Sequence, residues 1–135
     1  MPKIYYDKDA DLKHIKDRTI AIIGYGIQGR GQALNLRDSG LNVIVSQREG
    51  GVNYEQAVKD GFKPMDAREA AKKADIIQIL TQDHLQAEIY KKSIKAYLKK
   101  GKSLVFSHGF NIHFKQIVSS QDVDVWMIAP KSAGA

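Results

Sequence analysis

The sequence predicts an α/β fold with a doubly wound, mainly parallel sheet in a single domain. Short apolar runs alternate with segments of helical periodicity, and this alternation is typical of a parallel sheet with helices on its faces. The runs are almost continuously apolar, as expected for strands that are buried on both sides. The 135 residues, 43% of them hydrophobic, suffice for one core, so we expect one domain over residues 1–135.

Each expected strand is a run of apolar, mostly β-branched residues that stops at a glycine or a polar loop. The stretch 62–65 is too short to predict more than a brief edge strand. The expected strands are 19–24, 42–46, 75–80, 103–107 and 124–129.

One expected helix precedes the first of these runs and the others lie between them, several with a boundary signal. Ser39-Gly40 is a C-cap signal for the first long helix, and Asp66 is a good N-cap residue for a later one. The expected helices are 9–16, 27–39, 54–60, 66–73, 83–99 and 112–118.

The composition excludes several classes of function. The chain has no cysteine, which rules out disulfides and thiolate metal sites. No apolar run approaches the roughly 20 residues that span a bilayer, and the first residues do not resemble a targeting peptide. We therefore expect a cytoplasmic protein without a membrane partner. The net charge of +6 could suit nucleic acid, but the densest lysines, at 91–100, fit the solvated face of an amphipathic helix, and we expect no nucleic-acid partner.

A G-x-G-x-x-G motif, formed by Gly24, Gly26 and Gly29, follows the first expected strand and opens a helix. In this context the spacing is typical of a Rossmann-like dinucleotide-binding turn. The first glycine permits the tight turn, the second lets a pyrophosphate approach the backbone, and the third lets the helix pack on the sheet. The helix N-terminus would offer free N–H groups to the phosphates. The alternative is a glycine-rich turn in another kind of α/β protein.

The end of the second expected strand bears on the choice of cofactor. NAD sites usually carry an Asp or Glu about 20 residues beyond the first glycine, and this tip reads Ser46-Gln47-Arg48. Arg48 could instead pair with a 2′-phosphate, which favours NADP over NAD, although the adjacent Glu49 would weaken that preference. The alternative for Arg48 is an ordinary exposed loop residue.

His108 is the only histidine at the carboxyl end of an expected strand, where ligands of such sheets bind. It could orient a substrate or transfer a proton near a nicotinamide, or it could be a satisfied structural histidine. The acidic pairs of the chain, such as Asp122 with Asp124, do not form a convincing magnesium cage. We therefore predict no metal site within this chain.

Several longer stretches carry a family resemblance. The most specific is F-S-H-G-F-N-I-H-F at 106–114; the others are G-Y-G-I-Q-G at 24–29, A-L-N-L-R-D-S-G at 33–40, Q-A-E-I-Y at 86–90, D-V-D-V at 122–125 and A-P-K at 129–131. Together they resemble the N-terminal, NADP-binding domain of ketol-acid reductoisomerase, also called acetohydroxyacid isomeroreductase. The resemblance covers nearly the whole chain.

The resemblance implies an oxidoreductase that uses NADPH and Mg²⁺ in branched-chain amino-acid biosynthesis, the route to valine and isoleucine. Such enzymes convert 2-acetolactate or 2-aceto-2-hydroxybutyrate to 2,3-dihydroxy acids by alkyl migration and hydride reduction. By resemblance, His108 is the active-site histidine and Arg48 faces the 2′-phosphate. The other implied cofactor contacts are Gly24, Tyr25, Gly26, Ile27, Gln28 and Gly29 at the pyrophosphate, Asp83, His84, Leu85 and Gln86 in the loop after strand 75–80, and Gly134.

The sequence departs from the family pattern at positions that bear on the cofactor. Gly51 and Asn53 stand where NADPH-selective members usually carry serines that bind the 2′-phosphate. Use of both NADH and NADPH is therefore a hypothesis. Thr81-Gln82 replaces an apolar-Pro pair, and Ser132-Ala133 replaces Gly-Pro.

Members of the family continue into an all-helical C-terminal domain. That domain supplies the Mg²⁺ carboxylates, most contacts to the 2-hydroxy-2-alkyl-3-keto acid substrate and the main oligomer interface. Residues 1–135 do not include it, so we expect this chain alone to bind cofactor without full activity. The alternative is a stand-alone dinucleotide-binding module with a sensing or scaffold role.

Overall fold

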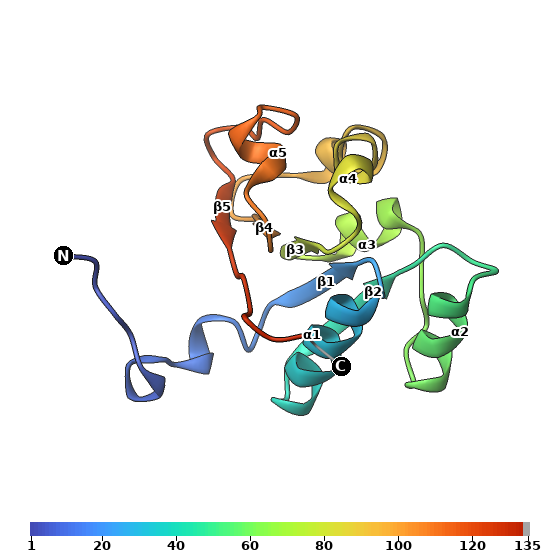
Figure 1. Ribbon diagram of the computed structural model, residues 1–135, viewed down its shortest axis with the longest axis horizontal. Helices are drawn as coiled ribbons and strands as arrows, with labels where there is room; N and C mark the ends of the chain where they lie inside the picture. The colour runs from blue at the N-terminus through green and yellow to red at the C-terminus, as the bar shows by residue number, and fades with distance from the viewer. Residues whose placement is uncertain (134–135) are drawn as a thin grey trace.

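A sheet of five parallel strands forms the centre of the molecule, in the order β2-β1-β3-β4-β5 (Figure 1). The computed structural model describes residues 1–133. The chain passes from β1 outward to β2 and then crosses to β3 on the other side of β1, so the doubly wound parallel fold is confirmed. The strands are β1 (Thr19–Ile23), β2 (Asn42–Ser46), β3 (Ile76–Ile79), β4 (Ser103–Phe106) and β5 (Asp124–Met127).

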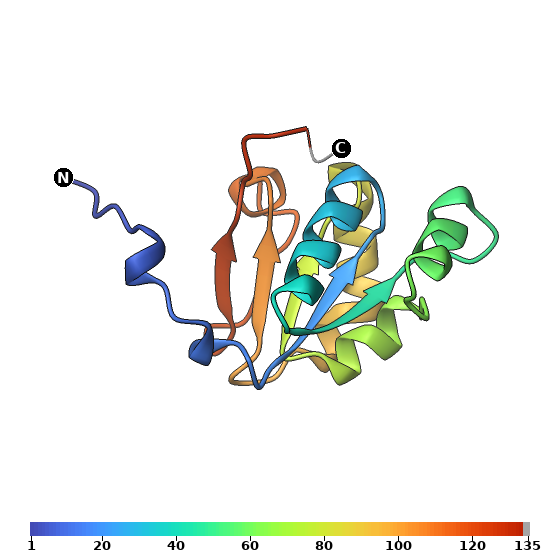
Figure 2. The ribbon, with the colours of Figure 1, turned by 90° about the horizontal axis from the view of Figure 1, so that it is seen from below.

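Helices lie on both faces of the sheet (Figure 2). On one face, α1 (Ile27–Asp38) buries Ala33 in a core cluster with Ile22 of β1. On the other, α3 (Ala67–Lys73) buries Ala71 with Ile23, because successive residues of a strand point to opposite faces. The remaining helices are α2 (Val52–Lys59), beyond the edge of β2, α4 (Asp83–Ile89), on the face of α3, and α5 (Phe110–His113), after β4.

The prediction of one long helix over 83–99 is wrong. The α-helix ends at Ile89 and continues as a π turn (Tyr90–Ile94) and a 3₁₀ turn (Lys95–Tyr97). The N–H of Lys95 reaches back five residues to the carbonyl of Tyr90, which widens the turn. Tyr90 and Ile94 are both buried in this arrangement, while the neighbouring lysines stay exposed. Packing against the sheet therefore overrides the regular helical repeat.

The short peripheral elements also differ from expectation. The helix expected at 9–16 is replaced by two 3₁₀ turns, Asp7–Asp9 and Leu12–His14. The helix expected at 112–118 instead begins at Phe110 and ends at His113, two residues before Lys115 adopts a positive φ of 55°. The edge strand expected at 62–65 is a single bridge between Met65 and Ser46.

The predicted cap of α3 is confirmed. Asp66 lies in an extended conformation before the helix, and its Oδ1 accepts the N–H of Glu69 at 2.9 Å. This bond satisfies one of the donors that a helix leaves free at its N-terminus.

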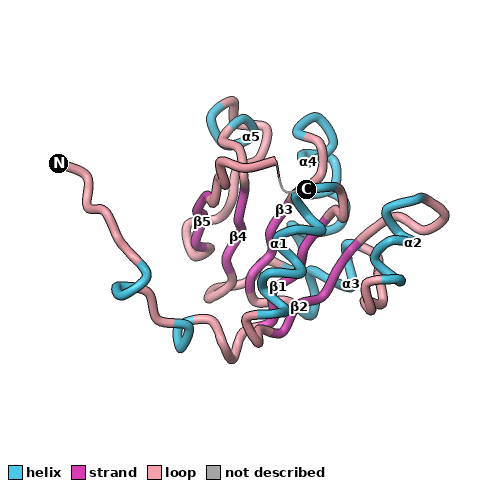
Figure 3. The backbone as a smooth tube through the Cα atoms, turned by 60° about the horizontal axis from the view of Figure 1, so that its bottom comes forward, coloured by secondary structure: helices cyan, strands magenta, loops and turns pink. Residues whose placement is uncertain are grey.

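The expectation that every strand is covered on both faces is wrong for β5. Val125, Trp126 and Met127 are each more than a third exposed, and Ile128 after them is 43% exposed. Within residues 1–133 no later element returns to pack on this edge of the sheet (Figures 1 and 3). The apolar character of β5 therefore predicted a strand correctly, but not its burial.

Residues 1–14 run away from the sheet as an exposed segment, and Ile15 is partly buried against the core on the α1 face (Figure 3). Over residues 1–133, no helix has both the length and the apolar character that crossing a bilayer requires.

Candidate functional site

The G-x-G-x-x-G motif forms the turn from β1 into α1, at the switch point of the sheet. Gly24 has φ +102°, and a Cβ there would lie 2.8 Å from the Cγ2 of Thr81, so both the backbone and the space require glycine. Its N–H donates to the carbonyl of Ser46 at 2.9 Å, which joins the turn to the end of β2. The predicted strand–turn–helix context is confirmed.

The other two glycines of the motif differ in what surrounds them. A Cβ on Gly29 would lie 1.9 Å from the carbonyl oxygen of Gly24, so the helix can approach the turn only without a side chain there. A Cβ on Gly26 would have no atom within 4 Å. The space beside Gly26 is therefore open to a ligand, as the dinucleotide interpretation requires.

The N-terminus of α1 faces this open space. Gly26 is the N-cap residue and makes no side-chain cap bond, and the first helical hydrogen bond runs from the Arg30 N–H to the Gly26 carbonyl at 2.8 Å. The amides of Ile27, Gln28 and Gly29 precede that bond, and the first amides of a helix have no partner within it. They form an electropositive end suited to phosphate.

Tyr25 points away from this space although it lies within the motif. Its side chain is 1% exposed and packs edge-on against Phe62, with ring centroids 5.7 Å apart. Its hydroxyl donates to Oδ2 of Asp60 at 2.8 Å, and its backbone N–H donates to Oε1 of Gln47 at 2.7 Å. The side chain therefore anchors the turn and does not face the space beside Gly26, and the backbone N–H is already bonded to Gln47.

Asp60 is the centre of the cluster that holds Tyr25. The Arg30 guanidinium contacts both of its carboxylate oxygens, at 2.7 and 3.2 Å, and Gln56 donates to Oδ1 at 3.0 Å. The hydrogen bonds from Arg30 and then from Tyr25 hold the pKa of Asp60 far below its usual range. Burial, followed by the bond to Asp60, raises the pKa of Tyr25 well above its usual range. The cluster ties α1 to the end of α2 without a change of charge near neutral pH.

We expect Asp60→Asn to lower the free energy of unfolding at pH 7, because Arg30 and Tyr25 lose a charged partner. A carboxyl with a depressed folded pKa contributes stability above its unfolded pKa of about 3.9, and this contribution falls as pH drops toward the folded value. The difference between wild type and Asp60→Asn should therefore shrink below about pH 4 in urea unfolding experiments. Asp38→Asn is the matched control, since Asp38 is 75% exposed. A wild-type advantage that stays constant down to about pH 3 would contradict this role for Asp60.

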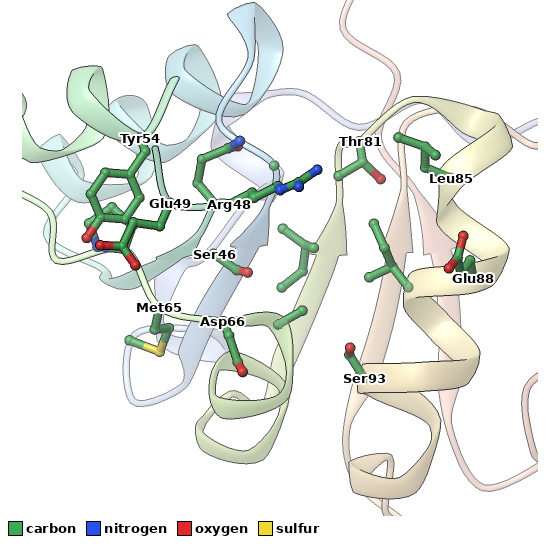
Figure 4. A pocket seen from close by; sticks show the side chains of 16 residues that line it. Ser46, Arg48, Glu49, Tyr54, Met65, Asp66, Thr81, Leu85, Glu88 and Ser93 are labelled. Carbon is green, nitrogen blue, oxygen red and sulfur yellow. The ribbon is translucent and has the colours of Figure 1, made fainter. Parts of the chain in front are cut away.

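A pocket of about 700 Å³ opens beside the glycine turn, between the ends of β1, β2 and β3 (Figure 4). Arg48 extends from the end of β2 across its mouth toward Thr81, and Glu49 lies with Tyr54 on the side of α2. The volume falls within the range of small-molecule sites. The pocket is lined by Ile23, Gly24, Ser46, Gln47, Arg48, Glu49, Tyr54, Pro64, Met65, Asp66, Ala67, Thr81, Leu85, Glu88, Ile89 and Ser93.

Gly51 and Asn53 lie at the start of α2, outside the lining of this pocket. Gly51 is the N-cap and makes no side-chain cap bond, and Asn53 is exposed in the first turn. The loop that joins them to Arg48 and Glu49 borders the pocket. These residues are therefore placed to contact only a group that projects from the pocket toward α2.

The four predicted contact residues 83–86 lie not in a loop but at the start of α4, and they divide between the surface and the interior. Leu85 lines the pocket, and His84 and the partly exposed Asp83 lie at the surface. Gln86 is 4% exposed, and its amide donates to the carbonyl of Thr81 at 2.8 Å. Its Oε1 accepts from the amide of buried Asn111 at 2.9 Å. Gln86 is thus engaged in holding the loop.

His108 follows β4 by two residues, and its side chain is 70% exposed. Its Nδ1 accepts the N–H of Phe110 at 3.2 Å, and Oδ2 of Asp83 lies 3.7 Å from the same nitrogen. An Nδ1 that accepts a hydrogen bond has no proton of its own, so the proton of a neutral ring sits on Nε2. The hydrogen bond is the better defined of the two contacts, and it leaves Nε2–H free on the exposed ring.

Two buried hydroxyls at the carboxyl ends of the strands indicate whether a polar ligand fits there. The hydroxyl oxygens of Thr81 and Ser107, which follow β3 and β4, are buried without a hydrogen-bond partner among the described residues. Buried hydroxyls are normally bonded, so these two leave donors and acceptors for a ligand. Together with the open space at Gly26 and the end of α1, they fit a dinucleotide.

The remaining predictions concern Gly134 and metal binding. Gly134 lies outside the described residues. Across residues 1–133, no three His, Asp or Glu side chains gather closely enough to hold a metal ion.

Several residues that build the site escaped the sequence interpretation. Gln47 and Asp60 hold Tyr25 from 22 and 35 residues away, and Asn111 reaches Asp83 and Gln86 across the ends of two strands. Asn111 lies within the specific F-S-H-G-F-N-I-H-F stretch, which could have indicated a role. Neither Gln47 nor Asp60 had any local signal.

Comparison with known proteins agrees with this geometry. Residues 14–135 match the family model for the NADPH-binding domain of acetohydroxy acid isomeroreductase. The chain is 56% identical over 135 residues to a ketol-acid reductoisomerase (NADP(+)) of Methanocaldococcus jannaschii, and covers 41% of that protein. It superposes with a TM-score of 0.92 on the structure of an NADH-preferring ketol-acid reductoisomerase from an uncultured archaeon, at 47% identity over 97% of this chain and 41% of the other.

A more distant structure shares only the fold. An NAD-bound semialdehyde dehydrogenase NAD-binding protein from Cupriavidus necator has a TM-score of 0.74 at 18% identity, with 82% of this chain covered. The chain spans about two fifths of the length of the two reductoisomerases it matches. It therefore belongs to the acetohydroxy acid isomeroreductase (ketol-acid reductoisomerase) family and carries the NADPH-binding domain of that family.

Proposed function

We propose that this chain is the cofactor-binding part of a ketol-acid reductoisomerase. That enzyme converts 2-acetolactate or 2-aceto-2-hydroxybutyrate to 2,3-dihydroxy acids. The observation that carries the proposal is the glycine turn: the open space at Gly26 faces the free amides of α1, in a chain that belongs to this family. NADPH bound there supplies the hydride for the reduction step.

The cofactor would lie along the carboxyl ends of the strands. The adenosine end fits the pocket beside Arg48 and Leu85, and the pyrophosphate fits the amides at 27–29. The nicotinamide would then point toward β4 and His108. There the free Nε2–H of His108 could orient the substrate or exchange a proton with it.

A helical partner domain would complete the active site. The relatives are more than twice as long as this chain. An exposed apolar surface at the β5 edge, made of Ile112, Val125, Trp126 and Met127, supports packing of a further domain there, because such surfaces usually mark interaction sites. We propose that Mg²⁺ is held by carboxylates of that domain and that the 2-hydroxy-2-alkyl-3-keto acid binds between the two domains.

The proposal is tested by measuring binding and turnover separately. We expect residues 1–135 to bind NADPH or NADH but not to consume 2-acetolactate with Mg²⁺, and to gain turnover when joined to the helical domain of the archaeal relative. Turnover by residues 1–135 alone would contradict the need for a partner domain. Cofactor binding that never leads to turnover in the joined protein would favour a sensing or scaffold role instead.

Arg48 should decide how strongly the chain prefers NADPH. We expect Arg48→Ala to weaken NADPH binding by about 10- to 100-fold through loss of a charge-assisted bond to the 2′-phosphate, and to change NADH binding much less. Glu49→Gln should strengthen NADPH binding, because a carboxylate next to the 2′-phosphate repels it. Kd values for both cofactors check these expectations, with Arg18→Ala as the control, because Arg18 precedes β1 at the amino ends of the strands, away from the pocket. Equal losses of affinity for NADPH and NADH in Arg48→Ala would contradict a contact between Arg48 and the 2′-phosphate.

A further inference from the structure

A glutamine lies in the middle of the otherwise apolar strand β3. Gln78 is 3% exposed and pairs in register with Ile22 of β1 and Val105 of β4, on the face that α1 covers. A buried amide is costly in such surroundings unless it is hydrogen-bonded. Its partner is Gln32 of α1, whose Oε1 accepts from Gln78 Nε2.

Two further bonds continue from this pair to the far end of the chain. Gln32 Nε2 donates to Oε1 of Gln28, one turn earlier on α1, at 3.3 Å. Gln28 Nε2 donates to the carbonyl of Ser132 at 2.9 Å, across 104 residues of sequence. We call Gln78, Gln32 and Gln28 the amide relay.

The relay has a single direction. The Ser132 carbonyl can only accept, so Gln28 must turn its NH₂ group toward it and its oxygen toward Gln32. Gln32 in turn presents its oxygen to Gln78. Gln78 begins the relay as a donor, and Gln32 and Gln28 each accept one bond and donate the next, so the orientation of the Gln28 amide is coupled to the buried Gln78.

The end of the relay coincides with the phosphate site. Residues 130–133 leave β5 and pass over the N-terminal end of α1, where Gln28 holds them (Figure 2). The same turn of α1 carries the free amides at 27–29. The relay thus fixes both Gln28 and the segment that passes beside it.

We propose that Gln78 and Gln32 are positioning residues that act through Gln28, and that they preorganise the phosphate site by holding residues 130–133 against the start of α1. The proposal rests on cofactor binding at the glycine turn. Neither glutamine touches the cofactor. Their effect is to remove the ordering cost that a mobile Gln28 and an untethered segment 130–133 would add to binding.

The test uses Gln78→Met, which keeps the length of the side chain but cannot donate to Gln32. Gln116→Met is the matched control, because Gln116 is exposed and bonds only to the nearby carbonyl of Phe114. Without cofactor, we expect Gln78→Met to shift the NMR signals of the Gln28 side-chain amide and of the backbone amides at 131–133, while Gln116→Met leaves them in place. Unchanged signals in a folded Gln78→Met protein would overturn the proposal. If that variant does not fold, Gln32→Met breaks the relay at a half-buried position and is measured in the same way.

Binding measurements then separate positioning from simple packing. We expect Gln78→Met to raise the Kd for NADPH by about threefold to tenfold, and to add nothing to the loss caused by Gln28→Ala in the double variant. If Gln78→Met raised the Kd for NADPH by the same factor in the wild-type protein and in the Gln28→Ala variant, the relay would be overturned. If the wild-type chain binds no cofactor, the proposed function fails, and the NMR measurement still decides whether the relay holds residues 130–133.

Discussion

Alanine at Gly29 is expected to destabilise the fold, whereas alanine at Gly26 should leave the fold intact and weaken cofactor binding. At position 29 the added Cβ would sit 1.9 Å from the carbonyl oxygen of Gly24, a backbone atom that cannot move without opening the turn. We expect a loss of about 3 kcal/mol in the free energy of unfolding.

Gly26 is the matched comparison within the same motif. Its backbone, with φ −76° and ψ −164°, is one that alanine adopts freely, and its Cβ would meet no atom of the protein. The free energy of unfolding of Gly26→Ala should therefore lie within about 0.5 kcal/mol of the wild-type value. The same methyl group would occupy the space through which the pyrophosphate approaches the backbone, so the Kd for NADPH should rise at least about tenfold.

Urea unfolding and NADPH titration of both variants check these expectations. The informative result is the contrast between the two variants. Gly29→Ala should lower the free energy of unfolding, and Gly26→Ala should raise only the Kd for NADPH. Normal NADPH affinity in Gly26→Ala would mean that the phosphates bind elsewhere. A fully stable Gly29→Ala would mean that the close packing of α1 on the turn is not required.

The features predicted from the sequence are those that depend on neighbouring residues. The β-branched run before Gly24 formed β1, the glycine spacing formed the turn into α1, and Asp66 capped α3. Each rests on backbone preferences within a few residues, which the sequence displays directly.

The features that were missed depend on distant partners. The family resemblance implied a cofactor contact at Tyr25, and it did not show that Asp60 and Phe62 hold the side chain in the interior. The apolar strand β5 is partly exposed to solvent. Its sequence could not show this, because the burial of a strand depends on what packs against it and not on its own composition. The path from Gln78 to Ser132 joins positions that no local pattern connects.

Asn111 should have the other large effect, because it joins α5 to the start of α4, beside the proposed nicotinamide end of the site. Its side chain is 1% exposed, and its amide donates to the carbonyl of Asp83 at 3.0 Å and to Oε1 of Gln86 at 2.9 Å. Leucine has the same number and branching of side-chain heavy atoms, although it is larger, and it cannot donate, so Asn111→Leu would remove the bond to the Asp83 carbonyl and leave the buried Oε1 of Gln86 without this donor. We expect a loss of about 2–4 kcal/mol in the free energy of unfolding.

Asn35→Leu is the control for this substitution, because Asn35 is exposed on α1 and the change there should cost less than about 0.5 kcal/mol. A second measurement concerns function: the NMR signals of the His108 ring should shift in Asn111→Leu, since Asp83, 3.7 Å from that ring, loses its anchor. If Asn111→Leu lowered the free energy of unfolding by less than about 1 kcal/mol, the role of Asn111 in holding α4 and α5 together would be contradicted. An unchanged His108 signal in a destabilised protein would show that Asn111 supports the fold without setting the position of the histidine. We expect both a lower free energy of unfolding and shifted His108 ring signals, because the buried Asn111 amide that bonds to Gln86 also holds the backbone carbonyl of Asp83 beside His108.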